Sequence, residues 1–500
     1  MEWTNVLKGR FSSDVYSTAW VAMVPDRFNS ARPQWPAALD YLRRSQLPDG
    51  GWGAGEVYYA HDRTISTMAA VLALSRCGHD TADTTYIYNG LHALRGYAAD
   101  LASEPHEPIG FELLLPHLRN LLIPAYGDML PLEQWRRVDA AGEEKLRLLK
   151  SLTPYAGQPQ SWWVNMEMLD EGHLAALGRE FLDENGAIAA STAATAAFLR
   201  AKRLHGAESE PAAAYLAALV EADDGGVPFC WPAEIFESVW GIDSLMRANE
   251  NPGDAAYAGV METIERTWQR DPQGLSFSAT FPVNDGDDTL VGYRLLRQSG
   301  RKPDPAIIEQ FWQGDHFCAY TNERGSSNSV NVHALEALFN EGGEPDPKAT
   351  STLRWLQSQL NDDDLLDDKW HISPLYTAAH AVPAFAGMSA ELGMERATIL
   401  LAHQRQDGGW GWLGRSTLEE TAHVVLALYQ AHERRLVDAL PALRHAALFF
   451  LERRHEHPQE RLWIGKTLYR PDGIVTATLY AAQLALGKLG LPHTDLRGSA

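Results

Sequence analysis

The sequence is poor in the features of disulfide-rich, basic and membrane-spanning proteins. Its three cysteines, Cys77, Cys230 and Cys318, are far apart and odd in number, so we expect a reducing cytosol and no disulfide framework. With 43 basic against 65 acidic residues, it lacks the basic excess of a nucleic-acid-binding protein. It also lacks a secretory signal and any apolar run of the ~18 residues that a membrane-spanning helix needs.

Alternating runs of β-branched residues, which predict strands, are nearly absent. Ala/Leu-rich segments instead carry apolar residues three and four positions apart and often end at glycine or a basic turn; the clearest are 66–78, 419–435 and 476–490. The pattern predicts an all-α protein. A length of 500 residues corresponds to about two to four domains.

One octapeptide occurs in both halves of the chain. Residues 46–53 (QLPDGGWG) and 404–411 (QRQDGGWG) differ only at their second and third positions, and each copy lies between two helical segments. Asp-Gly-Gly is a tight-turn signal, because glycine adopts positive φ without strain. We expect the glutamine to bond the backbone at the next helix start and the tryptophan to stack over it, so that each copy joins helices and takes no part in chemistry.

The segment FPVNDGDDTL (281–290) places three carboxyl groups within four residues. Like charges this close oppose ionisation, so at least one of Asp285, Asp287 and Asp288 should keep its proton near neutral pH, in a coupled titration. A protonated carboxyl group in an apolar pocket is what protonation of an alkene requires, since carbon is a poor base. From these residues alone, a solvated acidic loop or a calcium-type cluster stays an alternative.

Taken in order, these motifs resemble those of the class II diterpene cyclases. The octapeptides resemble QW motifs, and DGDDTLVGYRLLR (285–297) resembles the acid motif with the helix that follows it. Further segments match in family order: VYSTAWVA (15–22, with Ser17 in place of the usual Asp), DRTIST (62–67), IGFEL (109–113), GGVP (225–228), AEIFE (233–237), DKWHISP (368–374) and LWIGKTLY (462–469).

The resemblance implies an all-α fold of two α-α double-barrel domains, β and γ, of the terpene cyclase and squalene-hopene cyclase superfamily. It assigns residues 1–25 and 256–500 to the β domain, which carries the acid motif. The γ domain, 26–255, is inserted after the first helix and carries the metal-binding glutamate. The active site is expected between the two domains.

Roles for individual residues also come from the resemblance. It makes Asp287 the general acid, tuned by Asp285 and Asp288, and Glu112 a ligand of Mg²⁺; a surface glutamate is the alternative. Lys466, with Lys369 and Arg63 as weaker candidates, would bind the diphosphate, unless Lys466 simply extends to solvent. Asn331 and Ser327 share a helix face near the acid, where either can bond the carboxyl group. His333 and His380 are expected in the core or behind the site, not on a metal.

The sequence departs from the plant-type ent-copalyl diphosphate synthases at the final base. Val164 and Phe229 stand where those enzymes have the histidine and asparagine that hold the deprotonating water, so a different base or skeleton is expected. Trp162, Trp163, Phe229 and Trp231 are candidates to line the pocket and stabilise cations with their ring faces. The alternative is that they pack the barrel cores.

The predicted function is protonation-initiated cyclisation of geranylgeranyl diphosphate to a bicyclic diphosphate by a cytoplasmic enzyme, either monomeric or a homo-oligomer. The same chemistry on farnesyl diphosphate is the alternative, with slight support from Trp162 and Trp163. A squalene-hopene-type cyclase and a non-catalytic helical barrel are less favoured. The DDLLD at 363–367 has the form of an ionising metal motif but lies in an acidic run without a partner motif, so it is interpreted as a solvated loop.

Overall fold

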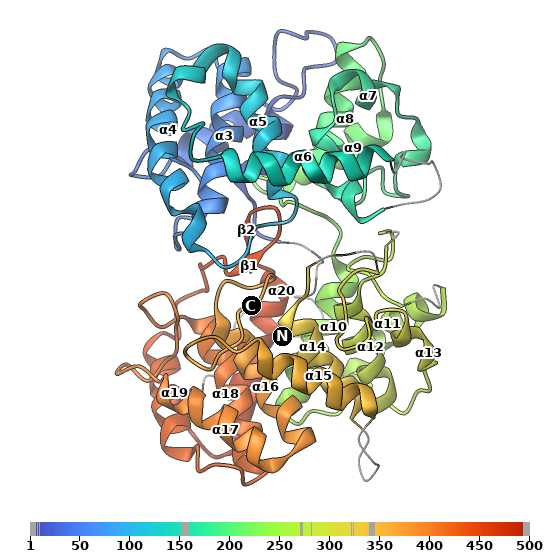
Figure 1. Ribbon diagram of the computed structural model, residues 1–500, viewed down its shortest axis with the longest axis vertical. Coiled ribbons are helices and arrows are strands. Elements are labelled where there is room, and N and C mark those ends of the chain that lie inside the picture. The colour runs from blue at the N-terminus through green and yellow to red at the C-terminus, as the bar shows by residue number, and fades with distance from the viewer. Residues whose placement is uncertain are drawn as a thin grey trace.

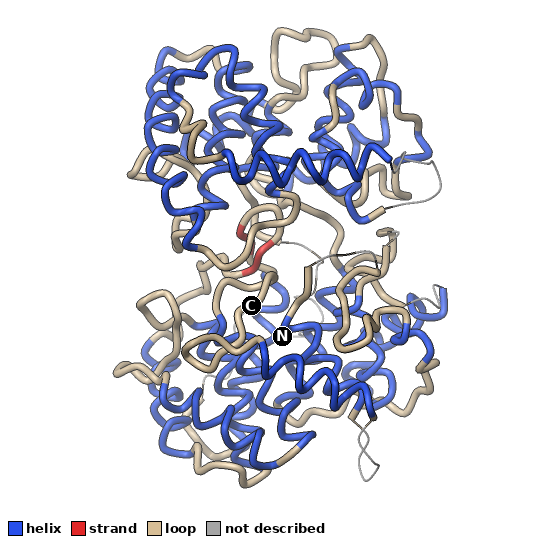
Figure 2. Tube along the Cα trace, in the orientation of Figure 1, coloured by secondary structure: helices blue, strands red, loops and turns tan. Residues whose placement is uncertain are grey.

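The computed structural model describes residues 7, 9, 11–151, 160–270, 274–281, 283–321, 323, 325–339 and 346–493. Figure 1 shows two helical lobes stacked along the long axis of the molecule. We call α1–α9 the N-terminal lobe, and α10–α20 with the strand pair β1–β2 the C-terminal lobe. Figure 2 shows helices joined by loops, with the two short strands between the lobes.

The N-terminal lobe is a closed ring of inner helices with further helices outside it. α1 contacts α3, α3 contacts α5, α5 contacts η4, η4 contacts α8, and α8 returns to α1. The inner elements are α1 (Val15–Ala22), α3 (Ala60–Cys77), α5 (Phe111–Tyr126), η4 (Ser161–Met168) and α8 (Thr192–Leu204). The outer ones are α2 (Pro36–Arg44), α4 (Thr81–Asp100), α6 (Arg136–Ser151), α7 (Glu171–Ala176) and α9 (Glu210–Ala222), with η2 (Leu101–Ser103), η3 (Gly127–Met129) and η5 (Arg179–Phe181) as short turns.

The C-terminal lobe repeats this plan. Its inner helices contact one another in sequence, and α20 closes the ring on α10. They are α10 (Glu234–Arg247), α12 (Gly286–Gln298), α14 (Asn328–Leu338), α16 (Pro374–Met388), α18 (Leu418–Glu433) and α20 (Asp472–Lys488). Outside lie η6 (Ala255–Tyr257), α11 (Ala258–Arg270), α13 (Ala306–Glu309), α15 (Pro347–Ser358), α17 (Ala390–Ala402) and α19 (Leu440–Glu452), and the hairpin is β1 (Trp463–Ile464) with β2 (Leu468–Tyr469).

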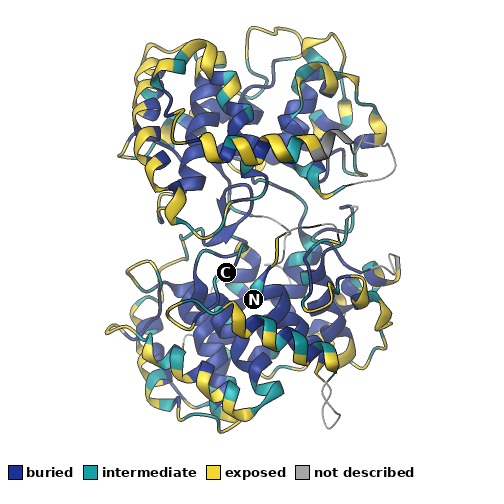
Figure 3. Cartoon of the chain, viewed as in Figure 1, coloured by how far each residue is buried: buried dark blue, intermediate teal, exposed yellow. Residues whose placement is uncertain are grey.

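The sequence explains which helices are inside. Inner helices such as α3 and α16 are buried on all faces along nearly their whole length. The outer α6 is rich in charged residues and exposes one face, which is yellow in Figure 3. This arrangement confirms the predicted all-α double-barrel fold.

The two octapeptides join helices as predicted. Gln46 donates to the carbonyl oxygens of Gly50 and Tyr86, both at 2.8 Å, and Gln404 donates to those of Gly408 and Ala442, both at 2.9 Å. Each tryptophan indole N–H donates to a carbonyl at the end of the preceding helix, from Trp52 to Leu42 and from Trp410 to Leu400, at 2.7 Å in both copies. Each motif therefore holds three helices of its own lobe together.

The chain crosses between the lobes at other points than the predicted domain boundaries. Phe11 packs in the C-terminal core, whereas α1 is buried within the N-terminal ring, so the first crossing lies near Ser13 and not at residue 25. The return lies just before Ala233, because α10 belongs to the C-terminal ring; the predicted boundary at 255 is therefore also displaced. Every residue of α1 is buried, and the helix contacts α3 and α8 of the N-terminal ring.

The hairpin β1–β2 joins the lobes. Its turn residue Gly465 accepts a hydrogen bond from Ile109 N at 2.8 Å, and the N–H of Leu468 donates to Asp62 of α3 at 3.1 Å. Both partners lie in the N-terminal lobe, so the hairpin fixes the position of one barrel on the other. No helix in the described part of the chain is long and apolar enough to cross a membrane.

Candidate active site

The three acidic side chains of 285–288 lie at the N-terminus of α12. Asp285 is the N-cap and accepts from Asp288 N at 2.8 Å, which is the ordinary way for a carboxylate to satisfy a helix start. Asp288 accepts from the indole N–H of Trp240 on α10 at 3.0 Å. Both carboxyl groups are buried, whereas Asp287 retains 16% side-chain exposure. Asp287 is thus the member of the triad with an accessible oxygen.

Asp287 is backed by a row of imidazoles. Its Oδ1 lies 2.6 Å from Nδ1 of His333 on α14, and His333 Nε2 lies 2.8 Å from Nδ1 of His380 on α16. His380 Nε2 lies 3.4 Å from Nδ1 of His423 on α18. The prediction that His333 and His380 lie in the core or behind the site agrees with these contacts.

The electrostatics favour retention of a proton in the triad. Burial, followed by the charge of Asp288, raises the pKa of Asp285 well above its ordinary value. Burial and the charge of Asp287 raise the pKa of Asp288 to about 7, although the Trp240 hydrogen bond opposes this. Neutral carboxyl groups therefore persist here at pH values at which an exposed aspartate is ionised.

Aromatic side chains continue from the triad toward the lobe junction. The Trp240 and Trp463 rings lie 6.4 Å apart, Trp463 lies 6.4 Å from Tyr469, and Tyr469 lies 4.8 Å from Phe229. Ring faces stabilise cations, so this series can accompany positive charge away from the acid. Three further aromatic residues contact it: Phe236, Tyr376 and Phe11.

Of the four aromatic residues predicted to line the pocket, only Phe229 belongs to this series. Trp163 packs against Phe181 at 5.1 Å, and Trp231 packs against Tyr215 at 5.9 Å, both within the N-terminal lobe. Trp162 is a partly buried member of the same core. Their packing matches the alternative in which they fill the barrel.

Glu112 lies in the first turn of α5, three residues after Ile109, which bonds the hairpin. Its carboxylate pairs with Lys145 of α6. Burial, followed by the charge of Glu112, raises the pKa of Glu107. In the described part of the chain, no group of three His, Cys, Asp or Glu side chains is placed to hold a metal ion. A cation here would therefore draw further oxygens from a ligand.

Lys466 differs from its predicted role. It is fully buried, with Nζ 2.6 Å from Glu167 Oε1 and 2.9 Å from Ser191 Oγ, and Tyr16 donates to the same Glu167 oxygen at 3.0 Å. The side chain neither reaches solvent nor presents a free charge; it pairs the hairpin with the N-terminal core. Lys369 is partly exposed and pairs with Glu323, while Arg63 pairs with Asp49.

Asn331 also lies elsewhere than predicted. Its amide donates to the carbonyls of Phe317 and Ser327 and accepts from Phe317 N, at 2.7–2.9 Å, so it holds the loop before α14. Ser327 is the N-cap of α14 and donates to Asp368. The polar residue of this helix that contacts the acid is His333, two residues closer to the C-terminus and about 200° around the helix axis.

Sequence reasoning missed His423, Trp240, Trp463 and Tyr469. Trp463 and Tyr469 are the first and last residues of WIGKTLY, within the matched segment 462–469. That match therefore already pointed to both. Trp240 and His423 occupy apolar helices with no local motif, and only the closure of the ring brings them to the acid.

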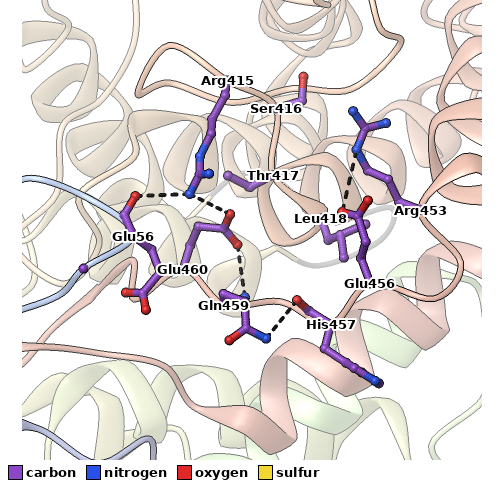
Figure 4. Close-up of a pocket in the computed structure, with 11 residues that line it drawn as sticks. Glu56, Arg415, Ser416, Thr417, Leu418, Arg453, Glu456, His457, Gln459 and Glu460 are labelled. Carbon is purple, nitrogen blue, oxygen red and sulfur yellow. Dashed lines mark hydrogen bonds and ion pairs between the residues drawn. The ribbon is translucent and has the colours of Figure 1, made fainter. Parts of the chain in front are cut away.

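Figure 4 shows a cavity of ≈ 520 Å³ at the lobe junction, lined by residues of 55–56, 415–418 and 453–460. Arg415 pairs there with Glu460 at 3.1 Å and donates to the Glu56 carbonyl at 3.1 Å. A second cavity of ≈ 390 Å³ includes Tyr41, Arg461 and Arg470. Neither contains a residue of the acid triad, so neither is the site of protonation.

No protein-family model matches the chain. A type B diterpene cyclase of Mycobacterium tuberculosis is 32% identical over 497 residues, covering 94% of this chain and 95% of that protein. A (+)-kolavenyl diphosphate synthase of Herpetosiphon aurantiacus is 30% identical over 526 residues, covering 97% and 96%. Among solved structures, an ent-copalyl diphosphate synthase of Streptomyces platensis matches with a TM-score of 0.79 and 26% identity, covering 97% of this chain and 98% of that one.

Proposed function

Because the chain belongs to the class II diterpene cyclases, we propose that it converts geranylgeranyl diphosphate into a bicyclic diphosphate. The observation that carries the proposal is the position of Asp287: an accessible carboxyl group between two buried ones, with one oxygen taken by His333. The reaction is an isomerisation, since one proton enters at the terminal double bond and one leaves the final cation.

In the proposed mechanism, Asp287 transfers the proton from Oδ2, the oxygen that His333 does not contact. The resulting tertiary cation is attacked by the next double bond, and that step repeats once to close two rings. The faces of Trp240 and Trp463 stabilise the cations as they move from the acid. After transfer, the Asp287 carboxylate keeps its hydrogen bond to His333.

We propose that Glu112 would hold Mg²⁺ against the diphosphate. A carboxylate suits this ion, which prefers hard oxygen ligands and keeps positions for phosphate oxygens and water. When bound, the ion neutralises diphosphate charge. Glu112 must then exchange Lys145 for the metal, and Lys145 becomes free to pair with a phosphate oxygen.

Retention of the diphosphate agrees with the structure of the DDLLD segment. Asp363 and Asp364 are exposed on a turn held by Asn361, whose side chain accepts from the N–H groups of Asp363 and Leu365. These carboxylates are far along the chain from Glu112 and belong to a loop of the C-terminal lobe. The carboxylates of Asp363 and Asp364 are thus in solvent, whereas Leu365 and Leu366 are buried in the C-terminal core.

The position of Trp162 and Trp163 removes the feature that favoured farnesyl diphosphate, since both pack in the N-terminal core. Val164 and Phe229 supply no polar group at the usual base position, so we propose a product other than ent-copalyl diphosphate. The three cysteines are free, and we propose a cytoplasmic enzyme.

The test is incubation with the C15 and C20 diphosphates and Mg²⁺, followed by phosphatase treatment and mass spectrometry of the alcohols. We expect a cyclised C20 alcohol from the wild type and none from Asp287→Asn, a loss beyond the roughly 10²–10⁴-fold typical of a general acid. Asp285→Asn and Asp288→Asn should be less severe, and Glu112→Ala should raise the Mg²⁺ requirement. Cyclised product from Asp287→Asn would place the acid elsewhere, and a C15-only product would change the substrate.

A further inference from the structure

The row of imidazoles behind Asp287 extends further than contact with the acid requires. His333, His380 and His423 come from the consecutive inner helices α14, α16 and α18, and each ring uses Nδ1 toward the acid side and Nε2 away from it. All three are buried, and His423 Nε2 at the far end has no hydrogen-bond partner among the residues that the structure describes. The order of the nitrogen atoms is therefore the same in every link.

Such a row has two possible directions. Each neutral imidazole has one N–H and one lone pair, so if His333 Nδ1–H donates to Asp287, then His380 donates to His333 and His423 donates to His380. The far end is then a lone pair on His423. In the opposite direction Asp287 donates its proton to His333, and an N–H of His423 is buried without an acceptor, which is the rarer situation in proteins.

We infer that His380 and His423 are positioning residues that hold His333 in the tautomer that donates to Asp287 Oδ1. The transferable proton of Asp287 is thereby confined to Oδ2, which faces the substrate. His333 also stabilises the carboxylate left after transfer, because its N–H already points at that group. This inference rests on the proposed function, since it assigns a role within the protonation step.

The surroundings of His380 and His423 keep these two imidazoles neutral. Burial and the positive charge of Arg247 lower the pKa of His380 well below its ordinary value, and burial and His371 do the same for His423. Tyr376 packs on His380 and His423, and Trp240 packs on His333. The nearest charged groups form their own buried network, Arg247 and Arg294 with Asp243 and Glu336.

The test compares two amides at one position. Asparagine places an amide N–H near imidazole Nδ1, so His380→Asn keeps a donor to His333, whereas His380→Gln places its amide near Nε2 and loses that donor. We expect kcat to fall about 10- to 100-fold in His380→Gln, the range seen when an outer partner of a histidine is removed, and to recover most of this in His380→Asn. KM for geranylgeranyl diphosphate should stay unchanged in both.

The control is His117→Leu, which removes an imidazole stacked on Trp20 in the N-terminal lobe and should leave kcat unchanged. Folding of each variant is checked by circular dichroism. Equal kcat values for His380→Asn and His380→Gln, with the wild type active and Asp287→Asn inactive, would overturn the positioning role alone. A wild-type enzyme without cyclisation activity would overturn the proposed function as well.

Discussion

A buried carboxyl group is costly when charged and inexpensive when neutral, and this difference keeps protons in the acid triad. Asp285 and Asp288 are both buried and both have raised pKa values, while Trp240 and the backbone satisfy their oxygens. Asp287, between them in the sequence, keeps 16% side-chain exposure and contacts His333.

Replacing Asp288 by asparagine should remove part of the pH dependence of stability. The folded pKa of Asp288 is about 7 against an ordinary 3.8, so its contribution to the free energy of unfolding is present below about pH 4 and is lost as the pH rises to about 7. The difference in the free energy of unfolding between wild type and Asp288→Asn should therefore change by on the order of a few kcal/mol between about pH 4 and pH 7. Denaturant unfolding at pH 4, 5, 6, 7 and 8 measures it.

The matched control for this experiment is Asp183→Asn. Burial raises the pKa of Asp183 to about 7 as well, but this residue lies in the N-terminal lobe and accepts from Ala190 N. It should show the same pH window without any loss of cyclisation. If wild type and Asp288→Asn differ in free energy of unfolding by the same amount from pH 4 to pH 8, Asp288 is ionised throughout this range.

The residue scale is also where sequence reasoning was least complete. The three carboxyl groups within four residues indicate a retained proton, but it is the resemblance to the class II cyclases that makes Asp287 the acid. The sequence predicts that Asn331 or Ser327 bonds the carboxyl group of Asp287, whereas the structure gives this contact to His333. Helix periodicity shows which residues share a face, but not the direction in which that face points. The sequence predicts that Lys466 binds the diphosphate. Its apolar neighbours are equally compatible with the buried ion pair to Glu167 that the structure shows.

At the scale of elements, the two octapeptides show how a local sequence fixes a helix junction. The aspartate and glycines form the turn, the glutamine bonds its own turn and a third helix, and the indole N–H bonds the helix before it. The turn is local and can be predicted from Asp-Gly-Gly, whereas the bond from Gln46 to Tyr86 joins residues 40 positions apart and cannot. The division of the chain into two barrels is also hard to predict from local sequence. The rings that α1 and α10 join depend on partners more than 100 residues away.

Gln46→Ala and Gln404→Ala should each destabilise one lobe. Each removes two hydrogen bonds from a partly buried amide and leaves carbonyl groups unsatisfied, which costs about 1–3 kcal/mol. Scanning calorimetry should show a lower transition temperature in both variants, with unchanged kcat for the folded enzyme. The control is Gln406→Ala, an exposed residue of the second motif, which should leave the transition where it is. Destabilisation by Gln406→Ala equal to that by Gln404→Ala would contradict the role of the motif.

For the whole molecule, the central feature is that acid and metal candidates lie in different lobes. Asp287 is in the C-terminal ring, Glu112 is in the N-terminal ring, and the hairpin β1–β2 contacts both the aromatic series and Ile109. In the proposed reaction, the prenyl tail lies at Asp287 and the diphosphate lies near Glu112. The relative position of the lobes is therefore a condition of catalysis, and the groups that fix it deserve the same test as the acid.

The buried pair of Lys466 and Glu167 is the strongest such group. Lys466→Met should cost about 3–5 kcal/mol, because it leaves the Glu167 carboxylate buried with only the Tyr16 hydroxyl as a partner. The double variant Lys466→Met/Glu167→Gln removes both charges and keeps an oxygen to accept from Tyr16. Its thermal stability should recover most of the loss, as expected when a buried pair is replaced by neutral groups of similar volume.

Kinetics of the same double variant separate an interface role from a ligand role. If Lys466 only joins the hairpin to the N-terminal core, restoring stability also restores the lobe geometry, and KM for geranylgeranyl diphosphate returns close to the wild-type value. If Lys466 binds the diphosphate, the double variant folds but keeps a raised KM, since the positive charge is still missing. The complete burial of Lys466 and its contacts to Glu167 and Ser191 lead us to expect the first result. A stable double variant with a raised KM would instead mean that Lys466 leaves Glu167 when substrate enters.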